Sequence, residues 1–196
     1  MPSDRLQAQI AFIVEVDRLK QVLRQSMLVG ERRRENDAEH SWHICLMAVL
    51  LREYAAQEVD LLRAVEMLLV HDIVEIDAGD TFAYDEAGHA DKEAREKEAA
   101  ERLFGLLPAE QGGRLRALWD EFEARQTPEA RYAAAMDRLQ PMLLNLATEG
   151  GGWKEHGITK GQVLEYNRHM GEGAPALWAY AEREVEAAAD KGYLGA

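Results

Sequence analysis

Residues 68–81, LLVHDIVEIDAGDT, place an imidazole and several carboxylates at the end of an apolar segment. His71 and Asp72 are adjacent, and Glu75 follows three to four positions later. Residues at that spacing share one face of a helix, so we expect these three side chains to converge. Burying them without compensation costs several kcal/mol per charge. Mixed nitrogen and oxygen donors suit a divalent ion such as Mn²⁺, Co²⁺, Fe²⁺, Zn²⁺ or Mg²⁺.

Three other polar residues strengthen this prediction. Asp80 follows Gly79, where the backbone can turn sharply. His40 starts an apolar segment, and Asp137 lies within another. A lone buried histidine or aspartate is more often a hydrogen-bonded core residue than a ligand. Here one shared ion would account for all of these residues, whereas separate accidents would each require a separate partner.

Helical periodicity dominates the elements that must position these residues, and no alternating strand pattern of useful length is present. Asp37, Asp60 and Thr127 are expected to cap helices, and Pro141 is expected to kink one. We predict one all-α domain over 1–196, with seven or eight helices. The expected helical segments are 4–24, 37–57, 61–76, 90–107, 109–125, 128–149, 160–170 and 174–190, with a loop at 77–90 and a flexible break at the glycines of 150–153.

Composition narrows the class of protein. A net charge of −13 argues against binding to nucleic acid polymers and to anionic membranes. No apolar run approaches a membrane span, and no signal peptide is expected before the first helix. Cys45 is the only cysteine, so no intrachain disulfide can form, and a cytoplasmic location is expected.

The pattern His40, His71-Asp72, Asp137 resembles the H…HD…D motif of HD-domain metal-dependent phosphohydrolases. The stretches RLKQVLR, EHSW and HDIVEIDAGDT, and the segment from LWDEFEA to RLQPML, resemble the 5′-deoxynucleotidase subgroup in particular. The resemblance covers about 10–148 and leaves the helices near 160–190 less firmly assigned. It implies an HD-domain helical bundle and a homodimer.

The resemblance also implies roles for single residues. His40, His71, Asp72 and Asp137 would hold the principal divalent ion. Glu75 and Asp80 would act in proton transfer, activate water or hold a second ion. Arg24, in the predicted first helix, would contact the substrate phosphate. Gln25 stands where some members carry a tryptophan that helps to discriminate the sugar, so a preference for deoxyribose does not follow. His43, three positions after His40, is the alternative ligand.

The sequence thus predicts a phosphomonoesterase acting on (deoxy)nucleoside 5′-monophosphates, with a small-molecule nucleotide as its substrate. One alternative is hydrolysis of another phosphoester, such as a nucleoside triphosphate or a cyclic nucleotide. A second is a non-catalytic HD module that binds metal or nucleotide. A third is a helical interaction protein with incidental polar pairs. The charge run ERRRE at 31–35 either steers phosphate or is a solvated, ion-paired surface.

Overall fold

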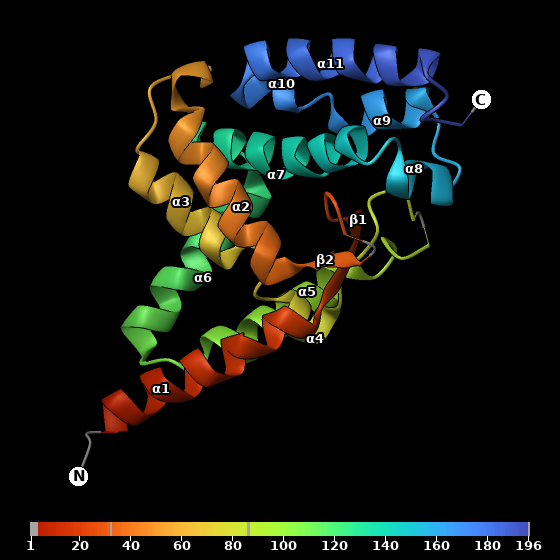
Figure 1. The fold of residues 1–196 in the computed structure, drawn as a ribbon. Helices are drawn as coiled ribbons and strands as arrows, with labels where there is room; N and C mark the ends of the chain where they lie inside the picture. Colours follow the sequence, from red (N-terminus) through yellow and green to blue (C-terminus); the bar gives the residue numbers. More distant parts are fainter. Residues whose placement is uncertain (1–3, 32, 86, 196) are drawn as a thin grey trace.

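A computed structural model describes residues 4–31, 33–85 and 87–195. It is built almost entirely from helices, which confirms the predicted all-α class (Figure 1). Eight α-helices in the described part have at least eight residues, in line with the expected seven or eight. They are α1 (Asp4–Val16), α2 (Asp37–Leu50), α3 (Leu61–Val70), α5 (Lys92–Phe104), α6 (Ala109–Ala124), α7 (Pro128–Ala147), α9 (Lys160–Asn167) and α11 (Pro175–Asp190).

Helix α7 is the central element, lying between α2 and α3 on one side and α11 on the other (Figure 1). As predicted, Thr127 caps it by accepting from the N–H of Ala130, and Pro128 occupies its first turn. The helix continues across Pro141. The surface of α7 is rich in alanine, and the short helix α10 (Met170–Gly173) packs closely against it. A Cβ on Gly173 would lie 2.1 Å from the carbonyl oxygen of Arg131, so this close approach requires glycine.

The predicted first helix is wrong beyond Val16. The chain passes through a 3₁₀ turn, η1 (Asp17–Gln21), and then forms a two-stranded antiparallel sheet from β1 (Leu23–Met27) and β2 (Arg34–Asn36). Arg24 therefore lies on a strand and not on a helix. An extended strand turns alternate side chains to opposite faces, and this directs the Arg24 side chain toward the start of α2.

The second and third predicted helices are shorter than expected. Helix α2 ends at Leu50 and is followed by the 3₁₀ turn η2 (Arg52–Tyr54). Helix α3 ends at Val70, and a new four-residue helix, α4 (Glu75–Ala78), follows. In between, the N–H of Glu75 bonds the carbonyl of Asp72, three residues back. This tighter 3₁₀ spacing changes the direction in which successive side chains point.

The C-terminal helices cover one side of α7 (Figure 1). A further short helix, α8 (Gly151–Glu155), occupies most of the stretch 150–153 that was expected to be a flexible break, and it places Trp153 in the core. Gly150 adopts a positive φ of 89° there, a conformation that favours glycine. Among the described helices, none combines the length and apolar character needed to cross a membrane. The prediction of a single domain over 1–196 stays a prediction.

Candidate metal centre

His40 and Asp137 come from α2 and α7 and meet in the core. His40 is fully buried, and its Nε2 lies 3.0 Å from Oδ1 of Asp137. The other ring nitrogen, Nδ1, lies 3.0 Å from Oε1 of Gln140. An amide oxygen only accepts, so we assign the ring proton to Nδ1. The Nε2 lone pair of His40 is then available to a cation.

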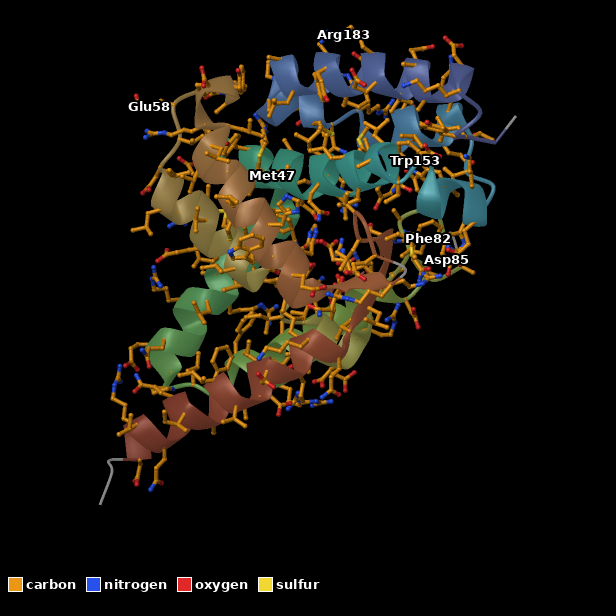
Figure 2. The ribbon with its side chains drawn as sticks, viewed as in Figure 1. Met47, Glu58, Phe82, Asp85, Trp153 and Arg183 are labelled. Atoms are coloured by element: carbon orange, nitrogen blue, oxygen red, sulfur yellow. The ribbon has the colours of Figure 1, made fainter. Side chains whose placement is uncertain are left out.

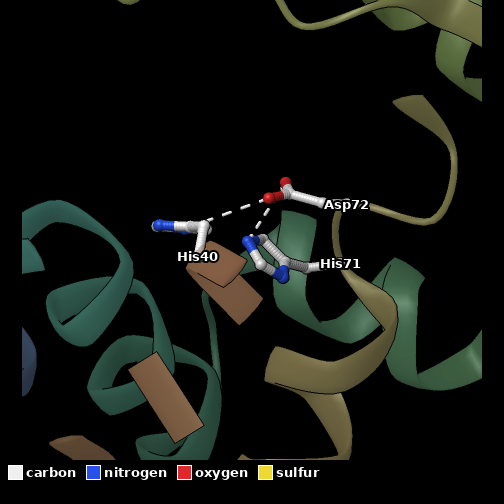
Figure 3. Close-up of side chains that lie close together, drawn as sticks. All are labelled: His40, His71 and Asp72. Atoms are coloured by element: carbon white, nitrogen blue, oxygen red, sulfur yellow. Dashed lines mark ion pairs between the residues drawn. The ribbon is translucent and has the colours of Figure 1, made fainter. Parts of the chain in front are cut away.

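His71 and Asp72 approach the same point from the turn after α3. His71 Nδ1 lies 2.9 Å from the carbonyl oxygen of Leu68, so this nitrogen donates and Nε2 faces inward. His71 Nε2 is 3.1 Å from Oδ1 of Asp72 and 3.7 Å from Oδ1 of Asp137. Figure 3 shows His40, His71 and Asp72 turned toward one another. The structure therefore brings all four predicted ligands together.

Arg24 lies against this cluster. Its Nη1 is 2.8 Å from Oδ2 of Asp72 and 3.1 Å from Oδ1 of Asp37, and its side chain is almost completely covered. Burial opposes ionisation of Asp72, but His71 and Arg24 outweigh it and lower the pKa of Asp72 below its ordinary value. Asp72 is therefore an anion at neutral pH, as a metal ligand must be.

Glu75 and Asp80 belong to a second, adjacent cluster with Asp37. The expectation that Glu75 converges on the same point as His71 and Asp72 is therefore wrong in detail. Burial and the neighbouring carboxylates of Asp72, Asp37 and Asp80 raise the pKa of Glu75 well above its usual range. Burial and Asp72 likewise raise the pKa of Asp37 to about 7. This second cluster is thus rich in carboxyl groups whose proton is easily shared.

The two clusters fit divalent cations by their chemistry. The buried atoms Oδ2 of Asp37 and Oε2 of Glu75 have no hydrogen-bond partner within the described residues, and Nε2 of His71 lies near carboxylate oxygens without hydrogen-bond geometry. Leaving such atoms unpaired in a protein interior is costly. Two imidazole nitrogens with carboxylate oxygens suit a first-row transition ion, and the all-carboxylate cluster suits a second, harder ion. The residues present therefore fit a metal, whose identity the donor set leaves open.

A cavity opens beside both clusters. Arg24 and Asp80 line it, together with the aromatic side chains of Phe82, Trp153 and Tyr166. Phe82 and Trp153 are labelled in Figure 2, on the side of the molecule where α8 lies. Cationic, acidic and aromatic groups at one opening can together hold an anionic group on a flat ring. We call this cavity the nucleotide pocket, after the kind of ligand that such a lining could hold.

Comparison with known proteins decides the family. The model of the HD domain family matches residues 16–178, which is most of the chain. The chain belongs to the HD domain family. The predicted resemblance to HD-domain phosphohydrolases is thereby confirmed.

Several curated relatives of this HD protein are named 5′-deoxynucleotidases. The zebrafish (Danio rerio) 5′-deoxynucleotidase HDDC2 is 28% identical over 135 residues, covering 68% of this chain and 66% of its own length. The human protein of the same name is also 28% identical, over 68% of this chain and 65% of its own. The fission-yeast (Schizosaccharomyces pombe) 5′-deoxynucleotidase hdd1 is 22% identical, over 94% and 86%. The matched region thus spans about two thirds of the vertebrate relatives.

Solved structures agree with this assignment. A crystal structure described as a predicted metal-dependent phosphohydrolase from Magnetospirillum magnetotacticum superimposes with a TM-score of 0.95 at 55% identity, covering 100% of this chain and 98% of the other. A conserved hypothetical protein from Pyrococcus furiosus has a TM-score of 0.59 at 21% identity, covering 83% and 97%. The second likeness supports the HD fold alone.

Sequence reasoning missed three buried polar residues of this HD site. Asp37 was expected only to cap α2, but Asn36 is the cap, in a capping box with Glu39. Asp37 is instead fully buried beside Arg24. Gln140 links His40 to Glu35, which accepts from Gln140 Nε2 at 2.6 Å. Glu35, in the run expected to be solvated or to steer phosphate, is almost inaccessible. The polar Gln140, within an apolar part of α7, was the available signal.

Replacing Gln140 with leucine is expected to weaken metal binding by about 10- to 100-fold, the usual effect of removing the group that orients a ligand. Without the Gln140 oxygen, the His40 ring loses its fixed tautomer and orientation. Competition with a chromogenic chelator measures the affinity. The same change at the exposed Gln57 serves as the control. Unchanged metal affinity in the Gln140 variant would show that this hydrogen bond does not support a ligand.

The remaining candidates lie outside both clusters. His43, the alternative ligand, approaches Gln140 Nε2 at 3.2 Å and is not part of either cluster. Asp77, which follows Glu75 in the sequence, pairs with Arg102 at the surface. Trp42 is 66% exposed, so it neither packs in the core nor lines the cavity.

Proposed function

We propose that this HD protein is a metal-dependent phosphomonoesterase that hydrolyses (deoxy)nucleoside 5′-monophosphates to nucleoside and phosphate. The observation that carries the proposal is the cavity beside the two clusters, where Arg24 and Asp80 lie with several aromatic side chains. The names of the curated relatives support the same substrate class. We assign His40, His71, Asp72 and Asp137 as ligands of the principal ion.

The chemistry divides between the ion and the side chains. The four assigned ligands would hold a divalent ion, which would supply a water of lowered pKa and draw charge from the phosphate oxygens. Arg24 binds the phosphate through N–H groups not used by Asp72 and Asp37 and stabilises the charge that develops there. Water adds to phosphorus and loses a proton, while the bond from phosphorus to the sugar 5′ oxygen breaks.

The sugar oxygen must leave with a proton, and we assign its donation to Asp80. Asp80 lines the cavity, whereas Glu75 does not. Burial and the facing Asp72 raise the pKa of Asp80, although Arg24 opposes them. A raised pKa favours the protonated carboxylic acid that a general acid requires. Glu75 lies beside Asp80 in the second cluster, and we assign it to activate the attacking water or to hold a second ion.

Gln25 leaves the sugar selectivity open. Its side-chain oxygen approaches Nε2 of His156 at 3.2 Å, and it lines the same cavity. A glutamine is smaller than the tryptophan of some family members. The proposal therefore covers ribonucleotides as well as deoxyribonucleotides.

The homodimer implied by the family resemblance stays a prediction. A measurement of the molar mass in solution would distinguish a dimer from a monomer. An apolar stripe on α2 suits such an interface, because Trp42, Leu46, Val49 and Leu50 are all exposed. The spacing of these residues places them on one helix face.

A product assay tests the proposed reaction. The protein, loaded in turn with Mg²⁺, Mn²⁺, Co²⁺ and Zn²⁺, is incubated with nucleoside mono- and triphosphates and cyclic nucleotides. We expect equimolar nucleoside and inorganic phosphate from 5′-monophosphates only. Tripolyphosphate from a triphosphate, or a monophosphate from a cyclic nucleotide, would replace the proposal with another phosphohydrolase activity. Tight nucleotide binding without turnover under every metal would favour a non-catalytic binding module.

A further inference from the structure

A second cavity, of about 300 Å³, adjoins the metal centre at Asp137. The cations Lys92, Arg125 and Arg138 line it together with the neutral His169 and the carboxylates of Glu123 and Asp137, and we call it the basic cavity. This is a concentration of cationic groups in a chain whose net charge is −13. Arg138 and Tyr166 line both this cavity and the nucleotide pocket, so these two side chains form the wall between them.

The basic cavity has unused hydrogen-bond donors. Arg138 Nη2 lies 3.3 Å from Oδ2 of Asp137, and its Nη1 donates to the Tyr166 hydroxyl at 3.0 Å. A guanidinium has five N–H donors, so these contacts leave most of them available. Arg125 makes no side-chain ion pair within the described residues. The buried Nε2 of His169 has no hydrogen-bond partner among them either.

Cations outnumber carboxylates around this cavity, with Lys92, Arg125 and Arg138 against Glu123 and Asp137. Burial, together with the nearby cations Arg138 and Arg125, lowers the pKa of His169 to about 4. His169 is therefore neutral, and its ring can donate one hydrogen bond and accept another. Within the described residues, the one ion pair of Lys92 is with Glu96, at 3.3 Å, along α5.

Shared lining residues place the cavities in a row. Arg125, Ala134 and His169 line both the basic cavity and a third cavity, of about 270 Å³, which Arg131 and Glu172 also line. The row runs from the nucleotide pocket, past Arg138 and Asp137, to this third cavity. An anion released at the metal centre thus has a cationic neighbour site that the nucleoside does not occupy.

We propose that the basic cavity is a second phosphate-binding site, which holds inorganic phosphate on the far side of Arg138 from the nucleotide pocket. Its role as a holding site for the phosphate released by hydrolysis rests on the proposed function. Binding there makes and breaks no covalent bond. Inorganic phosphate suits the site because several convergent N–H donors face a small cavity, and phosphate is the anion formed next to it.

Calorimetric titration of the metal-loaded protein with inorganic phosphate tests this site. A non-hydrolysable deoxynucleoside 5′-phosphonate first fills the nucleotide pocket. We expect phosphate still to bind, and Arg125→Met and Lys92→Met each to weaken that binding by about tenfold or more, as loss of a charge-assisted hydrogen bond does. Arg183→Met is the charge-matched control, because Arg183 lies on the outer side of α11 (Figure 2). The control variant should bind phosphate as the unaltered protein does.

Three results would overturn the proposal. The first is phosphate binding abolished by the phosphonate, since all the phosphate would then bind at the metal centre. The second is phosphate binding in Arg125→Met and Lys92→Met that matches Arg183→Met. The third is a higher affinity of the phosphonate-filled protein for a nucleotide than for inorganic phosphate. The basic cavity would then be a nucleotide-binding site. Phosphate binding can also be measured without the phosphonate, and it requires no hydrolysis. The comparison of the three variants therefore remains valid even if the protein shows no phosphatase activity.

Discussion

Replacing Asp72 with alanine is expected to remove the bound cation and the phosphatase activity together. Asp72 supplies one carboxylate of the His40, His71 and Asp72 cluster and also pairs with Arg24 at 2.8 Å. Its loss removes an anionic ligand and part of the site that positions the phosphate-binding arginine. We expect kcat/KM to fall by about 1,000-fold or more, because metal-ion catalysis contributes several kcal/mol. Elemental analysis of protein purified without chelator, alongside the phosphate-release assay, measures both effects.

Two companion variants separate metal loss from general damage. His71→Ala removes a ligand but leaves the contacts of Arg24 with Asp37 and Asp72 in place, and should lose the ion equally. Asp77→Ala removes a nearby carboxylate that pairs with Arg102 at the surface, and should retain both metal and activity. Added Mn²⁺ should raise the melting temperature of the Asp77 variant but not of the Asp72 variant. A metal-replete, active Asp72 variant would disprove the proposed centre.

The partners in the metal centre were predictable because they are chemically out of place. His40 lies at the start of an apolar helical segment, and His71 and Asp137 lie within two others, where burial makes a polar group require a partner. Periodicity identified the helices, and the shared requirement for compensation indicated that these distant residues meet. Oδ1 of Asp137 lies 3.0 Å from Nε2 of His40 and 3.7 Å from Nε2 of His71, in agreement with that reasoning.

The local geometry between α3 and α4 was not predictable in the same way. Leu, Val and Ile continue through residues 68–76 at helical spacing, so the pattern has no signal for a break. The chain nevertheless tightens after Val70, where bonds span three residues instead of four. This turn separates Glu75 from His71 and Asp72 and places it with Asp37 and Asp80. Tertiary contacts, and not propensity, set that turn.

Arg24 shows a similar limit for a different reason. An apolar residue recurs through Leu19 and Leu23 as a helix would require, yet the chain is extended from Leu23 onward. The two-stranded sheet depends on pairing between β1 and β2 across an intervening turn, and a local periodicity test does not detect that pairing. Glu35, on β2, is buried because the same pairing turns it toward Gln140, although its neighbours in sequence are all charged or polar.

Replacing Glu75 with glutamine is expected to retain the principal ion and to reduce turnover by at least about 100-fold, the usual effect of losing a proton-transfer group. Glu75 is almost completely buried with Asp37 and Asp80, outside the four-ligand cluster, so the four ligands keep their positions. The amide has nearly the shape of the acid but cannot exchange a proton or bind a second ion as a carboxylate does. Steady-state kinetics and metal stoichiometry on the same preparation measure the two effects separately.

The conservative Asp77→Asn change is the matched control for Glu75→Gln. Both replace one carboxyl of α4 with an amide, but Asp77 faces Arg102 at the surface while Glu75 faces the site. The control should keep its kcat, so a loss confined to the Glu75 variant reports on the site and not on the helix. Loss of the principal ion from Glu75→Gln would make Glu75 a ligand of that ion. Undiminished turnover would mean that the proton transfers and the attacking water require only Asp80, because it is the carboxyl of the second cluster that lines the nucleotide pocket.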